Sequence, residues 1–137
     1  RGEFRTVSVG VLTWEKDVFA DMDMTTDEDV ERKQTQVTIV DAAHPMAAGL
    51  SGTVAVYTSQ EYVTWGAVTS DADVIASVVG DASKAALFGY ETADTMANGY
   101  TAPARRVGVF LDDDSATVLT TDGTSLIDAA LEWALGL

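Results

Sequence analysis

The chain has 137 residues, of which 47% are hydrophobic and 22% are charged, a composition typical of one globular domain. Its 22 acidic residues outnumber its 8 basic residues and give a formal net charge of −14. A surface of that sign repels phosphate backbones, so nucleic-acid binding is not expected. No apolar run approaches the roughly 20 residues of a membrane-spanning helix, so membrane insertion is not expected either.

The residue inventory excludes several kinds of active site. The chain has no cysteine, which excludes thiolate nucleophiles, disulfides and zinc–thiolate sites. Its single histidine, His44, excludes metal centres built on two or more imidazoles. Neither a Walker A sequence nor a G-x-G-x-x-G loop occurs, so no nucleotide-phosphate loop is predicted.

The first part of the sequence predicts a strand, a short helix and a loop. Residues 6–12 are β-branched and mostly apolar, a pattern typical of a buried strand. Residues 15–24 place Val18, Phe19 and Met22 on one face of a short helix. Residues 25–32 are polar and acidic and predict a solvated loop.

The middle of the sequence predicts several strands and one short turn of helix. Residues 36–40 alternate with period two, as in a half-buried strand. Pro45 fits a first helical position and Gly49 fits a C-terminal stop, which predicts a one-turn helix within residues 41–50. Further strands are expected at residues 53–57, 62–65, 72–79 and 85–90. The last two are expected to pair through a five-residue loop at residues 80–84.

The last part of the sequence predicts a strand, a turn and the clearest helix. Residues 106–111 have the composition of a buried strand, and residues 112–114 form a charged turn. An amphipathic pattern from a cap at Asp122 or Thr124 to about Leu135 predicts a helix. Strands followed by this helix predict a single α/β layered domain over residues 1–137, with a mostly parallel or mixed sheet.

Three residues are candidates for acid–base work. His44 could act as a general base or a single metal ligand, but no nucleophile motif accompanies it. Packing or capping at the start of the short helix is therefore its expected role. Glu15 and Glu61 lie at the ends of predicted strands, where carboxylates from several strands could converge.

Two groups of aspartates are candidates for Ca²⁺ or Mg²⁺. The first group is Asp21, Asp23, Asp27 and Asp29, which have the spacing of the first ligands of an EF-hand loop. Thr26 and Arg32 stand where that loop needs glycine and glutamate, so an EF-hand is rejected and only a looser site remains. The second group is Asp112 and Asp114, beyond the end of a predicted strand. Solvated charge is the expected role of both groups.

The aromatic residues offer one further candidate site. A platform for stacking sugars could form from Trp14, Tyr57, Tyr62, Trp65, Tyr90 and Tyr100. Most of these rings are expected to pack in the core instead.

Five short stretches occur in an order and spacing that extend over most of the chain. They are residues 44–50 (HPMAAGL), 57–62 (YTSQEY), 86–90 (ALFGY), 105–110 (RRVGVF) and 131–134 (LEWA). Their pattern resembles the ThuA-like group within the class I glutamine-amidotransferase-like fold. The resemblance implies a flavodoxin-like layered domain, and many such domains are accessory modules of large secreted or surface proteins of bacteria and archaea.

The sequence departs from that family in two ways. By comparison with the family, the N-terminal βαβ part of the domain is missing here. The family's glutamine amidotransferases use a cysteine nucleophile with histidine and glutamate partners, and this chain has no cysteine. No catalytic residue of that kind carries over to a position in this sequence.

We therefore expect a non-catalytic accessory or interaction module of a larger protein that is extracellular or at the cell surface. Its partners would be other domains of that protein or a partner chain, with carbohydrate as a candidate ligand. One alternative is a carbohydrate-related hydrolase or isomerase that uses Glu15, Glu61 or His44, and another is a self-association module. No cofactor is expected beyond the candidate Ca²⁺ or Mg²⁺. Abundant aspartate and scarce lysine also suggest adaptation to high salt.

Overall fold

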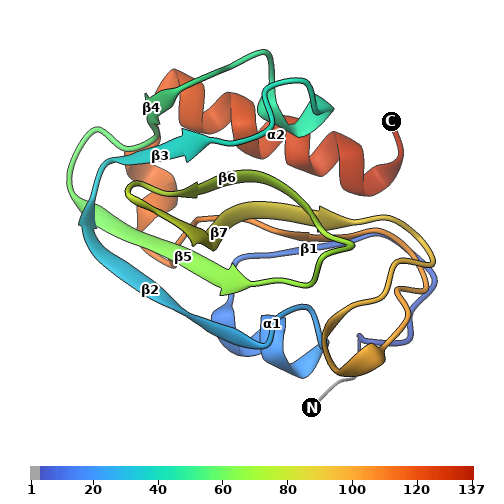
Figure 1. The fold of residues 1–137 in the computed structure, drawn as a ribbon. Coiled ribbons are helices and arrows are strands. Elements are labelled where there is room, and N and C mark those ends of the chain that lie inside the picture. The colour runs from blue at the N-terminus through green and yellow to red at the C-terminus, as the bar shows by residue number, and fades with distance from the viewer. Residues whose placement is uncertain (1–3) are drawn as a thin grey trace.

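The computed structural model describes residues 4–137, which form a β-sheet with a helix packed on each face (Figure 1). Within these residues the strands are β1 (Val11–Thr13), β2 (Asp27–Gln34), β3 (Gln36–Ile39), β4 (Thr53–Ala55), β5 (Glu61–Ala67), β6 (Asp73–Val78), β7 (Asp81–Tyr90) and β8 (Arg106–Gly108). The α-helices are α1 (Lys16–Asp21) and α2 (Thr121–Leu135). The 3₁₀ helices are η1 (Pro45–Ala47), η2 (Ala97–Gly99) and η3 (Ser115–Val118).

The sheet is mixed. Its main path runs β1-β8-β7-β6-β3-β4, and β5 joins β7 to β2. Among the described residues β1 and β8 pair in parallel, and the other strand pairs are antiparallel. The layered α/β domain predicted from the sequence is confirmed, with the mixed form of its sheet.

Helix α2 covers one face of the sheet. Its residues Leu126, Ala130 and Trp133 are buried in a cluster with Val107 of β8 and Leu87 of β7. The predicted apolar stripe is thus confirmed, but the predicted cap is wrong. The helix is capped by Thr120, which precedes both predicted caps. Its Oγ1 accepts a hydrogen bond from the Gly123 N–H at 2.9 Å.

Helix α1 packs against the opposite face. Phe19 is fully buried, and its ring meets the Phe88 ring edge-on with centroids 5.2 Å apart. Tyr90 lies in the same cluster and donates its hydroxyl to the Met24 carbonyl at 2.6 Å. The two helices therefore enclose a sheet with an apolar cluster on each side.

The solvated loop predicted at residues 25–32 is wrong, because most of it belongs to strand β2. β2 pairs only with β5, so it forms an edge of the sheet and most of its side chains are exposed or half-buried. Charged side chains on an edge strand discourage pairing with other chains. The acidic composition that predicted a loop is therefore also typical of an edge strand.

The strand predicted at residues 6–12 is shorter and begins at Val11. The residues before it lie along the side chain of Arg106, which is fully buried. The Arg106 guanidinium donates to the carbonyls of Arg5, Val7 and Val9 at 3.2, 2.7 and 2.9 Å. These carbonyls serve a side chain and not a neighbouring strand. Burial lowers the pKa of Arg106.

The hairpin between β6 and β7 is tighter than the predicted five-residue loop. β7 begins at Asp81, so the turn contains only Val79 and Gly80, and Gly80 has a φ of +83°. A positive φ is easily adopted by glycine, which explains the short turn. Within residues 4–137 no helix has the length and hydropathy required to cross a membrane.

Candidate functional site

The parallel pair β1 and β8 brings several acidic residues to one edge of the sheet. Carboxyl ends of parallel strands point the same way, so Glu15 after β1 and the turn at residues 112–114 after β8 lie together. The start of β5 joins them, because the Thr64 N–H donates to the Phe110 carbonyl at 3.0 Å and Thr64 Oγ1 donates to the Leu111 carbonyl at 2.7 Å. We call this the strand-end surface; it comprises Trp14, Glu15, Lys33, Glu61, Tyr62, Asp112, Asp113 and Asp114.

Glu15 and Asp113 form a hydrogen-bonded carboxyl pair on this surface. The hydrogen bond with Asp113 is the main cause that raises the pKa of Glu15, and partial burial adds to it. The same hydrogen bond lowers the pKa of Asp113, assisted by Trp14. The pKa values of the two groups therefore move apart, and Glu15 is the weaker acid of the pair. Trp14 Nε1 donates to Asp113 Oδ1 at 3.2 Å, which holds an indole ring that is 39% exposed.

Next to this pair lies an open hollow of about 370 Å³. Its lining includes Glu61 and Tyr62 of β5 together with Asp112 and Asp114 of the turn. Lys33 of β2 also lines it, at a bulge between Glu31 and Gln34 where Lys33 has a φ of +55°. The ring of Tyr62 is 40% exposed, with the guanidinium of Arg32 5.8 Å from its centroid.

Tyr57 connects two segments that border the hollow. Its buried hydroxyl lies 3.0 Å from the Tyr62 carbonyl and 3.1 Å from the Phe110 carbonyl, and its one proton can be donated to either. Burial raises the pKa of Tyr57, so its hydroxyl stays protonated and keeps this donor role. The start of β5 is thereby tied to the segment that leads into the acidic turn.

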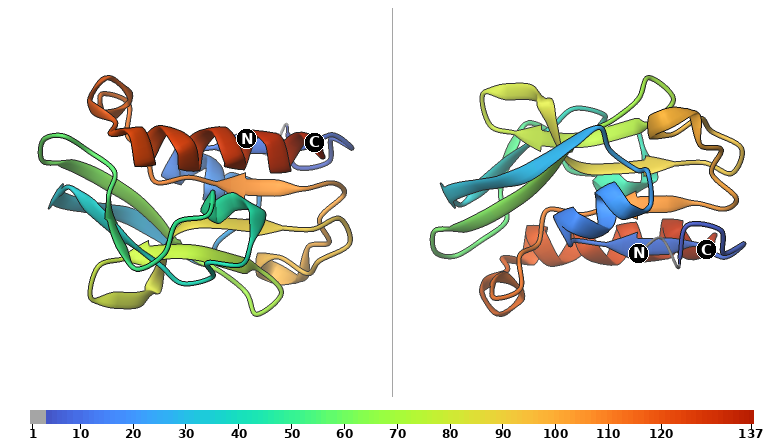
Figure 2. Two further views of the ribbon diagram at one scale, coloured as in Figure 1. Left: turned by 90° about the horizontal axis from the view of Figure 1, so that it is seen from above. Right: turned by 90° about the horizontal axis from the view of Figure 1, so that it is seen from below.

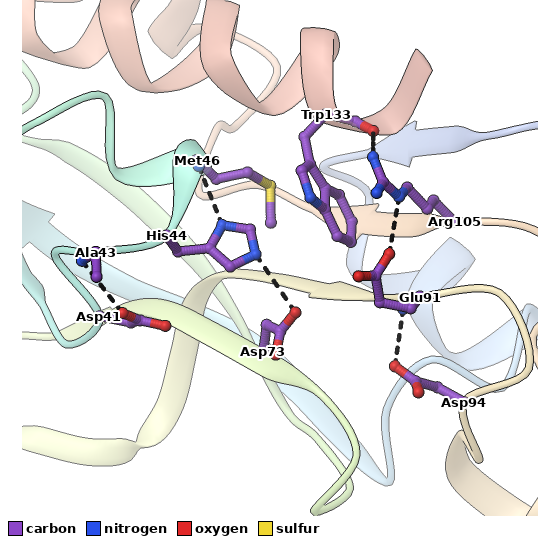
Figure 3. Close-up of polar contacts among 9 residues, drawn as sticks. All are labelled: Asp41, Ala43, His44, Met46, Asp73, Glu91, Asp94, Arg105 and Trp133. Atoms are coloured by element: carbon purple, nitrogen blue, oxygen red, sulfur yellow. Dashed lines mark hydrogen bonds and ion pairs between the residues drawn. The ribbon is translucent and has the colours of Figure 1, made fainter. Parts of the chain in front are cut away.

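His44 lies away from this surface, and both nitrogens of its ring contact other residues of the domain (Figure 3). Its Nδ1 accepts the Met46 N–H at 3.1 Å, which caps η1, and its Nε2 lies 3.3 Å from Asp73 Oδ2. This network places the neutral ring's proton on Nε2. The ring also packs against Trp133, with centroids 5.3 Å apart. Both nitrogens thus have partners, and His44 has the capping and packing role expected from its position before Pro45.

Polar contacts extend from Trp133 toward the loops beyond β7 (Figure 3). Arg105 stacks over the Trp133 ring at 4.2 Å from its centroid and donates Nη1 to the Trp133 carbonyl at 2.7 Å. Arg105 Nε donates to Glu91 at 2.9 Å, and the Glu91 N–H donates to Asp94 at 2.8 Å. These contacts connect the end of α2 to the loops before β8.

The structure therefore brings some of the predicted residues together and separates others. Glu61 joins Asp112 and Asp114 in the hollow, and Glu15 pairs with Asp113 beside it. His44 contacts Asp73, which pairs with Gly89, and Gly89 pairs with Val107 near the start of β8. His44 thus lies at the end of the sheet opposite to the acidic turn.

The first aspartate group is spread over three elements. Asp21 ends α1, whereas Asp27 and Asp29 lie on the edge strand β2. Asp23 accepts from Arg5 Nη1 and from Asn98 Nδ2, each at 2.8 Å. Among residues 4–137 the structure places no group of three or more His, Asp or Glu side chains around a common point where a metal ion could bind.

The aromatic candidates divide between core and surface. Tyr57, Trp65 and Tyr90 are buried, whereas Trp14 and Tyr62 are exposed on the strand-end surface. Tyr100 is half-buried beneath the guanidinium of Arg5, 4.7 Å from its ring centroid. Sequence patterns did not single out Lys33, because only the bulge in β2 brings it to the hollow. Asp113 could have been found, since it lies between two candidates in one predicted turn.

No family model, curated protein or solved structure matches the chain.

Proposed function

We propose that this chain is a non-catalytic accessory module of a larger extracellular protein and that its strand-end surface binds carbohydrate. The resemblance to ThuA-like domains supports the accessory role. The acidic surface supports a protein that works in high salt, where screening weakens repulsion among its carboxylates. His44 supports a non-catalytic role, because its two nitrogens already bind the scaffold.

The observation that carries the proposal is the position of two exposed rings around one acidic turn. Trp14 contacts Asp113, and Tyr62 lines the hollow with Asp112 and Asp114. Sugar rings have apolar C–H faces that pack on aromatic rings and hydroxyls that donate to carboxylates. An indole held by a hydrogen bond loses little freedom on binding, which favours affinity.

A second candidate function is a carbohydrate-related hydrolase or isomerase, since the opposite pKa shifts of Glu15 and Asp113 are typical of an acid and a base. Binding is favoured instead, because His44, the remaining acid–base candidate, is held by Met46 and Asp73 away from this pair.

The binding proposal is tested by affinity electrophoresis through gels that contain soluble glucans, xylans or mannans, followed by calorimetry with the matching oligosaccharides. Replacing Trp14 by alanine should weaken binding about tenfold or more, as expected for a central aromatic contact. Trp14→Phe keeps a ring and should retain most of the affinity. Val79→Ala, an exposed apolar residue on the β6–β7 turn, is the matched control and should bind like the wild type.

Two outcomes would contradict this function. One is the absence of binding across the polysaccharide panel, or equal binding by the Trp14→Ala and wild-type proteins. The other is release of reducing sugar by the purified protein and its loss in Glu15→Gln, which would establish the enzyme.

A further inference from the structure

A second exposed surface lies at the C-terminal end of α2, and its residues come from two distant parts of the sequence. Leu131, Leu135 and Leu137 are 44%, 68% and 87% exposed, and Val9 is 65% exposed. The N-terminal segment passes beside this end of the helix in both views of Figure 2. A Cβ atom added to Gly10 would overlap the carbonyl oxygen of Ala134. The N-terminal segment and the end of α2 are therefore in contact. We call Val9, Leu131, Leu135 and Leu137 the apolar end patch.

Two segments bring four exposed apolar side chains to the C-terminal end of α2. Nine large hydrophobic side chains are exposed among the described residues, and four of them form the patch. Contiguous exposed apolar surface with a polar rim marks an interaction site more often than scattered single residues do. A hollow of about 280 Å³ adjoins the patch at Leu137, and its lining also includes Pro45, Arg105, Glu132 and Trp133.

The charge around the patch selects the kind of partner. In its C-terminal half helix α2 carries Asp128 and Glu132, and its last turn has no basic residue. Arg105 is near, but its guanidinium is directed to Glu91 and to the Trp133 carbonyl. The rim that faces a partner is therefore acidic, and so is the whole molecule at −14. A second copy of the chain would bring the same charges into contact and be repelled.

We propose that the apolar end patch docks an amphipathic protein segment whose leucine-like side chains are flanked by lysine or arginine. The apolar side chains would cover the leucines of α2 and Val9. The basic side chains would face Asp128 and Glu132. This surface is separate from the strand-end surface, so the proposal is independent of carbohydrate binding.

The test uses a 14-residue amphipathic peptide of leucine and lysine as the probe, and the same peptide with glutamate in place of lysine as its control. Nuclear magnetic resonance spectra of the full chain are recorded at physiological and at molar salt. The leucine–lysine peptide should shift the signals of residue 9 and residues 131–137, and the glutamate peptide should not. The double variant Leu131→Ser/Leu135→Ser should weaken binding about tenfold.

A matched double variant separates docking from general attraction to an acidic protein. Val40→Ser/Val79→Ser removes two other exposed apolar side chains without changing any charge, and it should bind like the wild type. Equal affinity of both double variants would overturn the proposal. Signal shifts confined to other faces, or no binding of the leucine–lysine peptide, would overturn it as well. Dimerisation in molar salt that is lost in Leu131→Ser/Leu135→Ser would instead identify a second copy as the occupant.

Discussion

Glu15 and Asp113 show how two exposed acids acquire different properties through a single contact. Their hydrogen bond raises the pKa of Glu15 and lowers the pKa of Asp113, whose Oδ1 also accepts the indole N–H of Trp14. The orientation of the exposed ring therefore depends on the ionisation of its neighbours. A carboxylate on both residues would place two like charges in contact.

Replacing Glu15 by glutamine should raise the melting temperature at pH 7 by about 1–2 °C, as expected for an exposed pair. Because the folded state raises the pKa of Glu15, it keeps the proton where the unfolded chain has lost it. The contribution of Glu15 to stability is thus present at low pH and falls as the pH rises through the folded-state pKa. Thermal unfolding followed by circular dichroism between pH 4 and 8 should show the gain of the variant shrinking toward pH 4.

A control must separate this local effect from the loss of one negative charge by the whole molecule. Glu132→Gln removes the same charge from the exposed face of α2. Its melting temperature should differ from that of the wild type by a nearly constant amount over this pH range. A Glu15→Gln difference that is equally constant would contradict the shared proton.

At the level of elements, those with local signals could be predicted from the sequence. η1 follows from Pro45 at its first position, and α2 follows from its apolar stripe. β2 was missed because its acidic residues are explained only by its edge position, which is a property of the sheet. The N-terminal segment was missed because Arg106, about 100 residues away, takes its carbonyls.

The candidate site followed the same pattern. The gathering of Glu15 and the acidic turn could be expected from strand ends, because it depends only on two parallel neighbours. The contribution of Lys33 could not, because it depends on a bulge. The separation of His44 from both glutamates also needed the strand register.

The cap of α2 is a single residue that joins two elements. Thr120 Oγ1 accepts from the Gly123 N–H at 2.9 Å and donates to the Ala55 carbonyl of β4 at 2.7 Å. Thr120→Ala should lower the free energy of unfolding by about 1–2 kcal/mol, the cost of a lost cap with a further hydrogen bond. Urea denaturation measures this loss. Thr120→Ser keeps the hydroxyl and should lose less than half as much; an equal loss would assign the effect to the methyl group.

For the whole molecule, the net charge of −14 is the dominant electrostatic property. Within residues 4–137, some of the carboxyl groups that produce it have basic partners, such as Asp23 with Arg5 and Glu31 with Lys84. Repulsion among the rest destabilises the compact state when it is not screened. The molecule is therefore expected to be more stable where the ionic strength is high.

The melting temperature should rise by about 5 °C or more between 0.05 M and 2 M NaCl at pH 7. The Debye length falls to about 3 Å at 1 M salt, so repulsion between carboxylates that lie farther apart is screened. Differential scanning calorimetry measures the melting temperature. A series in NaCl and in tetramethylammonium chloride separates screening from specific cation binding, since the larger cation screens equally but binds carboxylates weakly. An unchanged or lower melting temperature in both salts would contradict adaptation to high salt.

The burial of Arg106 has a consequence for how this domain tolerates change. Its guanidinium contacts main-chain oxygens of residues 5, 7 and 9, and every amino acid supplies the same oxygen at these positions. The main-chain path of residues 5–9 therefore depends on Arg106, because no shorter or neutral residue at 106 could satisfy three carbonyls at once. The side chains of this segment remain available for contacts of their own, such as the ion pair of Arg5 with Asp23. The identity of one amino acid thus preserves the path of a segment that lies outside the strands and helices of the domain.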